Sequence, residues 1–134
     1  MELLQRYIKE VSADLVIDDF NLKNVQLKLP ATKHFWVARL IEAKIEKESL
    51  IKTKKSSKKA IIKDVIYAAP VKISQAAAEQ AAERHDTILS ITNKIREYDL
   101  VIMYLEKVEK VLHQMTWDCK NIIEIIQLVF WHKI

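Results

Sequence analysis

The sequence predicts a mainly α-helical, small single-domain protein, and three observations lead to that prediction. The chain contains no glycine, the residue that most readily allows tight turns and left-handed backbone. Prolines occur only at positions 30 and 70, so little interrupts long helices. Apolar residues recur at strides of three and four over long stretches, which is the spacing of one helical face. We therefore expect residues 1–134 to form one helical domain with one modest core.

The first thirty residues are expected to form a short helix followed by an arm. Leu4, Ile8 and Val11 have the spacing of one helical face, so residues 2–13 are predicted to be an amphipathic helix. Residues 14–29 change to a short alternation of apolar and polar side chains, which is typical of extended or irregular chain.

A long helix is predicted for residues 31–67. Pro30 suits the first turn of this helix, where a missing N–H costs nothing. An apolar stripe on its first third is centred on Val37, Ile41 and Ile45 and is supported by Phe35, Trp36 and Leu40. Residues 46–59 are polar on nearly every side, so this part of the helix must face solvent or a charged partner.

Residues 74–134 are expected to be helical again. Ser74 offers an N-cap to the alanine-rich run that follows it. A near-heptad seam then comprises Ile91, Ile95, Tyr98, Ile102, Leu105, Val108, Leu112 and Met115. Thr116 is predicted to cap a separate last helix that runs to about His132. Residues 68–86 stay open between helix and linker.

The central part of the long helix is strongly basic. Between positions 44 and 63 there are eight lysines and two glutamates, a local charge of +6 in a chain whose net charge is +4. Such asymmetry indicates a polyanion site, because each lysine that neutralises a phosphate releases counterions. Lys52, Lys55 and Lys59 share one face of a helix, and Lys54 and Lys58 add a neighbouring strip. The alternative is a helix face that is merely solvated.

The last segment of the chain is predicted to mediate self-association. Its apolar residues surround most of a helix and comprise Ile122, Ile123, Ile125, Ile126, Leu128, Val129, Phe130 and Trp131. One helix in a chain of this size can rarely bury all of them within a monomer, and large apolar surfaces mark interaction sites. The alternative is that this segment forms a buried strand, which its β-branched residues would permit.

Several classes of function are disfavoured by the sequence. Without glycine there is no phosphate-cradling loop, so we expect neither a nucleotide-driven motor nor a dehydrogenase. No histidines have a metal-ligand spacing and Cys119 is the only cysteine, so we predict no metal site and no cofactor. The acidic residues have no evident cleft, so the chain is not expected to be an enzyme. No apolar run is long enough for a membrane span and no signal peptide is evident, so we expect a cytoplasmic protein.

The order of these elements resembles the UvsY family of phage recombination mediators. The resemblance covers most of the chain and includes the short first helix leading into Leu15-Val16-Ile17-Asp18, Trp36 early in a long helix, and the lysine-rich second half of that helix. The segment Met115-Thr116-Trp117-Asp118-Cys119-Lys120 before an apolar helix is its most specific part.

The resemblance implies a recombination mediator that binds single-stranded DNA non-specifically and helps the phage recombinase replace the single-strand-binding protein. It further implies a homo-oligomeric ring, hexameric or heptameric, in the cytoplasm of the infected bacterial host. The DNA-binding residues of the family correspond here to Lys54, Lys55, Lys58 and Lys59, with Lys52 and Lys63 beside them. The oligomer contacts correspond to Ile122, Ile126, Val129 and Phe130.

Two departures from the family pattern affect the expected DNA contacts. The basic tract contains lysine but no arginine, and lysine is a compact charge suited to phosphate rather than to planar recognition. The paired tyrosines that follow the tract in the family are absent here, which leaves open the residues that stack on bases. Tyr67 is the nearest downstream aromatic ring, although a tyrosine at a helix end is more often a packing residue. The alternative function is a homo-oligomeric helical adaptor that binds no DNA.

Overall fold

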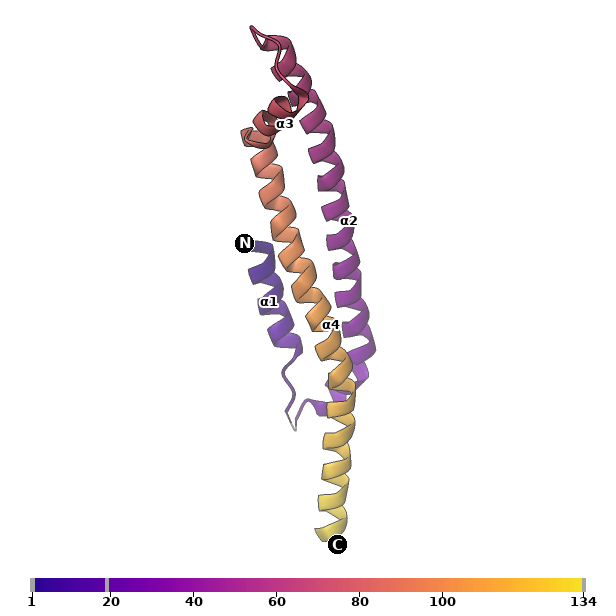
Figure 1. Cartoon of the computed structure of the whole chain (residues 1–134). Coiled ribbons are helices and arrows are strands. Elements are labelled where there is room, and N and C mark those ends of the chain that lie inside the picture. The colour runs from indigo at the N-terminus through magenta and orange to yellow at the C-terminus, as the bar shows by residue number, and fades with distance from the viewer. Residues whose placement is uncertain (1, 19, 134) are drawn as a thin grey trace. The chain divides into compact units, whose positions relative to one another are not determined.

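The computed structural model describes residues 2–18 and 20–133, with side chains as far as Trp131. Over these residues the secondary structure consists of helices joined by short non-helical segments, without strands, which confirms the mainly α prediction (Figure 1). The helices are α1 (Glu2–Asp14), α2 (Leu22–Ala68), α3 (Gln75–Glu83) and α4 (Asp86–Lys133). Their contacts group into two compact units: unit 1 comprises residues 1–41 and 101–134, and unit 2 comprises residues 42–100.

The core of unit 1 is built around Trp36 of α2, which is 2% exposed. The ring of Tyr7 from α1 meets the indole edge-to-face, with centroids 5.6 Å apart, a favourable geometry for aromatic pairs. The indole Nε1 donates a hydrogen bond of 2.8 Å to Asp14 at the end of α1. The other buried side chains of this core are Val11, Leu22, Leu29, Leu40, Val101, Leu105, Val108, Leu112, Met115 and Cys119. Trp36 thus connects α1 to α2 through a ring contact and a hydrogen bond.

Helix α2 begins earlier than the sequence pattern predicts. Residues 22–29 are helical, so the expected extended arm is wrong for this stretch. The Asp18 carboxylate accepts hydrogen bonds from the backbone N–H groups of Phe20 and Asn21, and the Asn21 side chain accepts one from the Asp18 N–H. These reciprocal bonds are the arrangement of a capping box, which satisfies the free donors at a helix start. The cap at Asp18 therefore decides where α2 begins.

Pro30 lies inside α2 rather than in its first turn. An internal proline removes one backbone hydrogen bond and costs about 3 kcal/mol. Leu22 and Leu29 are 6% and 4% exposed, so the burial of the preceding two turns offsets that cost.

The buried face of α2 is displaced from the predicted stripe. The buried residues are Trp36, Leu40 and Ala43, whereas Ile41 and Ile45 are 51% and 63% exposed. The prediction that the buried face is centred on Val37, Ile41 and Ile45 is therefore wrong. Trp36 sets the orientation instead, because the largest ring buries the most apolar area and the helix turns to bury it.

Helix α4 is continuous through the predicted break at Thr116. Met115 and Cys119, on either side of Thr116, are 4% and 0% exposed, so the buried seam simply continues. The side chain of Thr116 caps nothing and accepts a hydrogen bond of 2.5 Å from Lys33 Nζ. The prediction of a separate last helix is thus wrong. The alternative prediction of a buried strand is also wrong, because the same residues are helical to Lys133.

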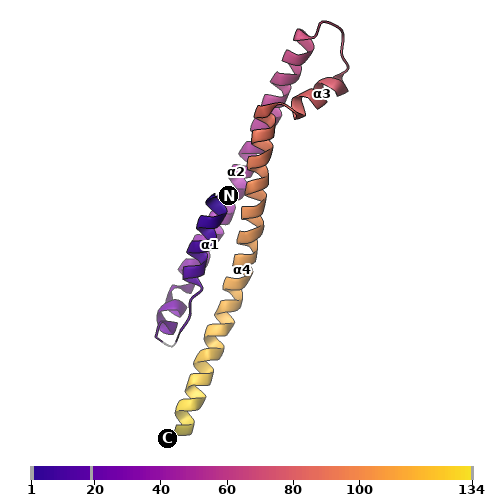
Figure 2. The ribbon, with the colours of Figure 1, turned by 90° about the vertical axis from the view of Figure 1, so that its left-hand side faces the viewer.

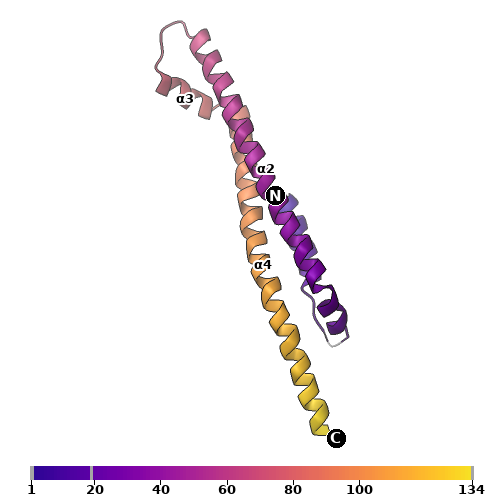
Figure 3. The same ribbon diagram turned by 90° about the vertical axis from the view of Figure 1, so that its right-hand side faces the viewer.

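Unit 2 contains the second half of α2, helix α3 and the first part of α4. Ser74 caps α3 as predicted, accepting a 3.1 Å hydrogen bond from the Ala77 N–H. Residues 69–74 are non-helical and α3 follows, so the stretch that the sequence left open is both linker and helix. Figures 2 and 3 show α3 turned back along the last turns of α2. The buried residues of this unit are Ala43, Ala78, Ala82, Ile88 and Ile91.

Candidate nucleic-acid interface

Seven of the eight lysines of α2 in unit 2 lie in two rows along the helix. With about 3.6 residues per turn, the spacing places Lys52, Lys55, Lys59 and Lys63 in one row, and all four are exposed. We call this row the outer lysine face. The same geometry places Lys47, Lys54 and Lys58 in a neighbouring row on another side of the helix, and all three are half-buried. We call this row the inner lysine face. The six predicted DNA-binding lysines are therefore split between the faces rather than gathered in one surface.

The inner lysine face is neutralised by acids of the same unit. Lys58 Nζ lies 2.6 Å from a carboxylate oxygen of Glu83 in α3, and Lys47 Nζ lies 2.5 Å from Asp99 of α4. The hydrogen bond from Lys58, followed by the charge of Lys54, lowers the pKa of Glu83 below its ordinary value. Bonding to Glu83 in turn raises the pKa of Lys58. These inner lysines thus already have anionic partners.

The outer lysine face has no such partners among the residues that the structure describes. None of its four lysines forms an ion pair within 4 Å there. Their ammonium groups are exposed and follow α2 for eleven residues, or about 16 Å at 1.5 Å per residue. A row of free, strongly hydrated point charges of this kind suits the phosphates of a strand rather than a planar ligand.

Apolar side chains continue this face toward the end of α2. Tyr67 is 93% exposed and Ile66 is 43% exposed. A hollow of about 450 Å³ is lined by Lys63, Asp64, Ile66 and Tyr67. A neighbouring hollow of about 530 Å³ is lined by Ser56, Lys59, Ala60, Ile62, Lys63, Ile66 and Gln75. The basic row therefore ends beside exposed apolar surface, a combination that suits a strand carrying both phosphates and bases.

The C-terminal end of α4 in unit 1 is largely uncovered. Of the predicted oligomer contacts, Ile122 is half-buried, while Ile126, Val129 and Phe130 are 47%, 49% and 64% exposed. The exposed large apolar residues of this segment also include Ile125, Leu128 and Trp131. These apolar side chains are thus not fully buried within the chain itself.

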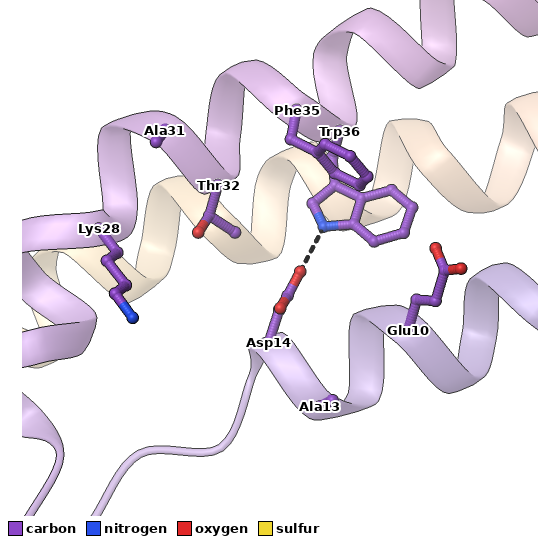
Figure 4. Close-up of a pocket in the computed structure, with 8 residues that line it drawn as sticks. All are labelled: Glu10, Ala13, Asp14, Lys28, Ala31, Thr32, Phe35 and Trp36. Atoms are coloured by element: carbon purple, nitrogen blue, oxygen red, sulfur yellow. Dashed lines mark hydrogen bonds between the residues drawn. The ribbon is translucent and has the colours of Figure 1, made fainter.

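Unit 1 contains a separate groove between α1 and α2 (Figure 4). It has a volume of about 560 Å³ and is lined by Glu10, Ala13, Asp14, Lys28, Ala31, Thr32, Phe35 and Trp36. Within this groove the carboxylate of Asp14 accepts a hydrogen bond from the Trp36 indole N–H, which the dashed line in Figure 4 marks. None of the lysines of the outer face lines this groove, so it is not part of the basic surface.

The described part of the chain contains no cluster of side chains suited to a metal ion. Within it, no three side chains of histidine, cysteine, aspartate or glutamate are grouped so as to hold a metal ion. Cys119 is buried, and burial raises the pKa of its thiol. None of the described helices combines the length and apolar character needed to cross a membrane.

Sequence reasoning did not find the acids that neutralise the inner face. Glu83 is 25 residues from Lys58, on another helix, so no local spacing reveals the pair. The one available signal is helical phase: Lys54 and Lys58 are out of phase with Lys52, Lys55 and Lys59. Lysine rows on different sides of one helix can have different environments.

Comparisons with known proteins identify the family and the fold of this chain. The family model described as "Recombination, repair and ssDNA binding protein UvsY" matches residues 10–129. The crystal structure of the bacteriophage T4 recombination mediator protein UvsY is similar, with a TM-score of 0.79 at 14% sequence identity. That match covers 93% of this chain and 97% of the other, and it shows a shared helical fold. A search of curated proteins found no match. With most of its length matched by the family model, the chain belongs to the UvsY family of recombination, repair and single-stranded DNA binding proteins.

Proposed function

We propose that this protein is a recombination mediator that binds single-stranded DNA along the outer lysine face of α2. The observation that carries the proposal is the row of exposed lysines without acidic partners among the described residues: Lys52, Lys55, Lys59 and Lys63. Family membership supports the polyanion as single-stranded DNA. Binding is expected to be sequence-independent, because ammonium groups that meet phosphates do not read bases.

The inner lysine face has a secondary role in this proposal. Lys58 is ion-paired with Glu83, and Lys54 lies within the electrostatic reach of the same acid. A phosphate that approached either lysine would first have to compete with that carboxylate. The outer face is therefore the primary contact, although both rows belong to the basic tract.

Self-association through the C-terminal segment of α4 supplies avidity in this proposal. Ile126, Val129 and Phe130 are exposed in the monomer, and their burial between copies removes apolar surface from water. Each added copy contributes another lysine row, and linked sites raise the effective concentration of the next contact. A homo-oligomeric ring of this kind holds the strand in the host cytoplasm and presents it to the phage recombinase in place of the single-strand-binding protein.

A matched pair of double variants tests the DNA-binding face. K55A/K59A removes two charges from the outer face, and K54A/K58A removes two charges from the inner face of the same helix. Affinity for labelled oligo-dT is measured against salt concentration, together with sedimentation of the complex. A single strand weakens with a log-log slope of about −0.7 per neutralised phosphate, so K55A/K59A is expected to reduce the slope by about 1.4 for each bound subunit.

The inner-face variant is expected to change affinity and slope much less. Equal losses in the two variants would contradict the assignment to the outer face. If the wild-type protein sediments as an oligomer but never carries oligo-dT, even at low salt, the protein is a homo-oligomeric adaptor instead. A stable monomer would contradict self-association through α4.

A further inference from the structure

The end of α2 carries an aromatic ring that has no packing role. Tyr67 is 93% exposed, so the ring does not stabilise unit 2 by burial. It follows Lys63 by one helical turn, about 6 Å along the axis, and its position in the helical repeat continues the outer lysine face. An exposed ring beside phosphate-binding lysines is the element that single-strand-binding surfaces use to hold bases.

Two hollows at the end of α2 share exposed apolar lining, and Tyr67 lines one of them. Lys63 and Ile66 line both hollows at this end of α2. Tyr67 lines only the smaller hollow, and Lys59 lines only the larger one. Ile66 is itself 43% exposed, so apolar surface is available in the hollow that Tyr67 and Lys63 also line. A nucleobase has a flat face for the ring and the aliphatic surface, while its phosphate remains within reach of a lysine.

Electrostatics separate the position of the base from the position of the phosphate. The last turn of α2 has no basic side chain, and the unpaired carbonyl groups at a helix C-terminus repel an anion. Asp64 lies in the same hollow as Tyr67 and adds a negative charge. Phosphates are therefore favoured at Lys59 and Lys63, one turn or more before the helix end, and the neutral base is favoured at Tyr67.

We propose that Tyr67, with Ile66 beside it, forms a stacking platform for one nucleobase of a strand whose phosphates bind Lys59 and Lys63. This inference rests on the proposed single-stranded DNA binding and adds a base contact to it. Stacking is tolerant of sequence because every base has a π-face, so the platform adds affinity without adding sequence preference. Its contribution also differs from that of the lysines, because a ring that meets no phosphate releases no counterions.

The test compares oligo-dT with an abasic oligonucleotide of the same length and the same number of phosphates. Y67A is expected to weaken oligo-dT binding about tenfold, the effect of losing one stacked base, and to leave abasic binding and the salt slope unchanged. Y67F keeps the ring and is expected to bind like the wild type. F20A is the control, because Phe20 is 98% exposed and belongs to unit 1, whereas the lysine tract belongs to unit 2.

The outcomes distinguish this platform from the lysine face. If the wild-type protein binds the two oligonucleotides equally and K55A/K59A still weakens both, the platform is wrong and the phosphate contacts stand. Equal weakening of both oligonucleotides by Y67A would also overturn it. Failure of the wild-type protein to bind either one would overturn the proposed function together with the platform.

Discussion

Lys58 of α2 and Glu83 of α3 form an ion pair, with Nζ 2.6 Å from the carboxylate oxygen. This pair places an acidic side chain over one side of a helix whose other side is proposed to bind DNA. Helix α3 buries only alanines, Ala78 and Ala82, so little apolar area holds it in place. The Lys58–Glu83 pair links α3 to α2, and it competes with any anion for the inner lysine face.

Replacing Glu83 by Gln is expected to strengthen binding to oligo-dT. The substitution frees Lys58 and removes the charge that faces Lys54, which enlarges the available cationic surface and steepens the salt slope. The slope is expected to change by about 0.7 for each additional phosphate contact. E109Q is the matched control, because it removes the same charge from an exposed position in unit 1. An E83Q affinity no higher than that of E109Q would argue against this competition.

The pair also predicts a pH dependence. The hydrogen bond from Lys58 lowers the pKa of Glu83 below its ordinary value of 4.5. A carboxylate of lowered pKa contributes stability above pH 4.5 that is lost as the pH falls through the lowered value. Because the pair is partly exposed, with side-chain exposures of 30% and 47%, this contribution is small and screened by salt. Carboxyl NMR titration should show the pKa of Glu83 rising toward 4.5 in K58A, and an unchanged pKa would contradict the pairing.

The hydrogen bond from Trp36 to Asp14 is expected to matter for the stability of unit 1. D14A leaves the part-buried indole N–H without its acceptor, and an unsatisfied buried donor costs about 1–3 kcal/mol. Urea unfolding followed by tryptophan fluorescence should give a lower midpoint for D14A. E10A is the control, because Glu10 is an exposed acid of α1 that lines the same groove. Equal midpoints for the two variants would indicate that the bond contributes nothing.

A charged C-terminal segment is expected to dissociate the proposed oligomer. I126D/F130D places two aspartates at positions that are 47% and 64% exposed in the monomer, so the helical fold should persist by circular dichroism. Burial of those charges between copies is costly, so sedimentation should show smaller species, and oligo-dT affinity should fall with the loss of avidity. Q127D is the control, because it adds a charge to an exposed position of the same segment that is already polar. An I126D/F130D protein that sediments like the wild type would exclude this segment as the interface.

The sequence by itself determined the helical class and most of its elements. The lack of glycine and the helical spacing of apolar residues are local properties, and they predicted the short first helix, the long basic helix and the Ser74 cap correctly. The seam through Leu105, Val108 and Leu112 was also predictable, because a buried face leaves a periodic record in the sequence. The exposure of apolar residues from Ile125 to Trp131 was also predictable, because apolar residues surround this part of the helix and one helix cannot bury them all.

Only the tertiary structure decided which side of each helix is used. Trp36 turned the buried face of α2 away from Ile41 and Ile45, and burial of Leu22 and Leu29 kept the helix intact through Pro30. Glu83 divided the lysine tract by pairing with Lys58 across 25 residues of sequence. Composition determines how much charge a helix carries, but the free charges are those that no distant side chain neutralises, and that depends on packing between helices.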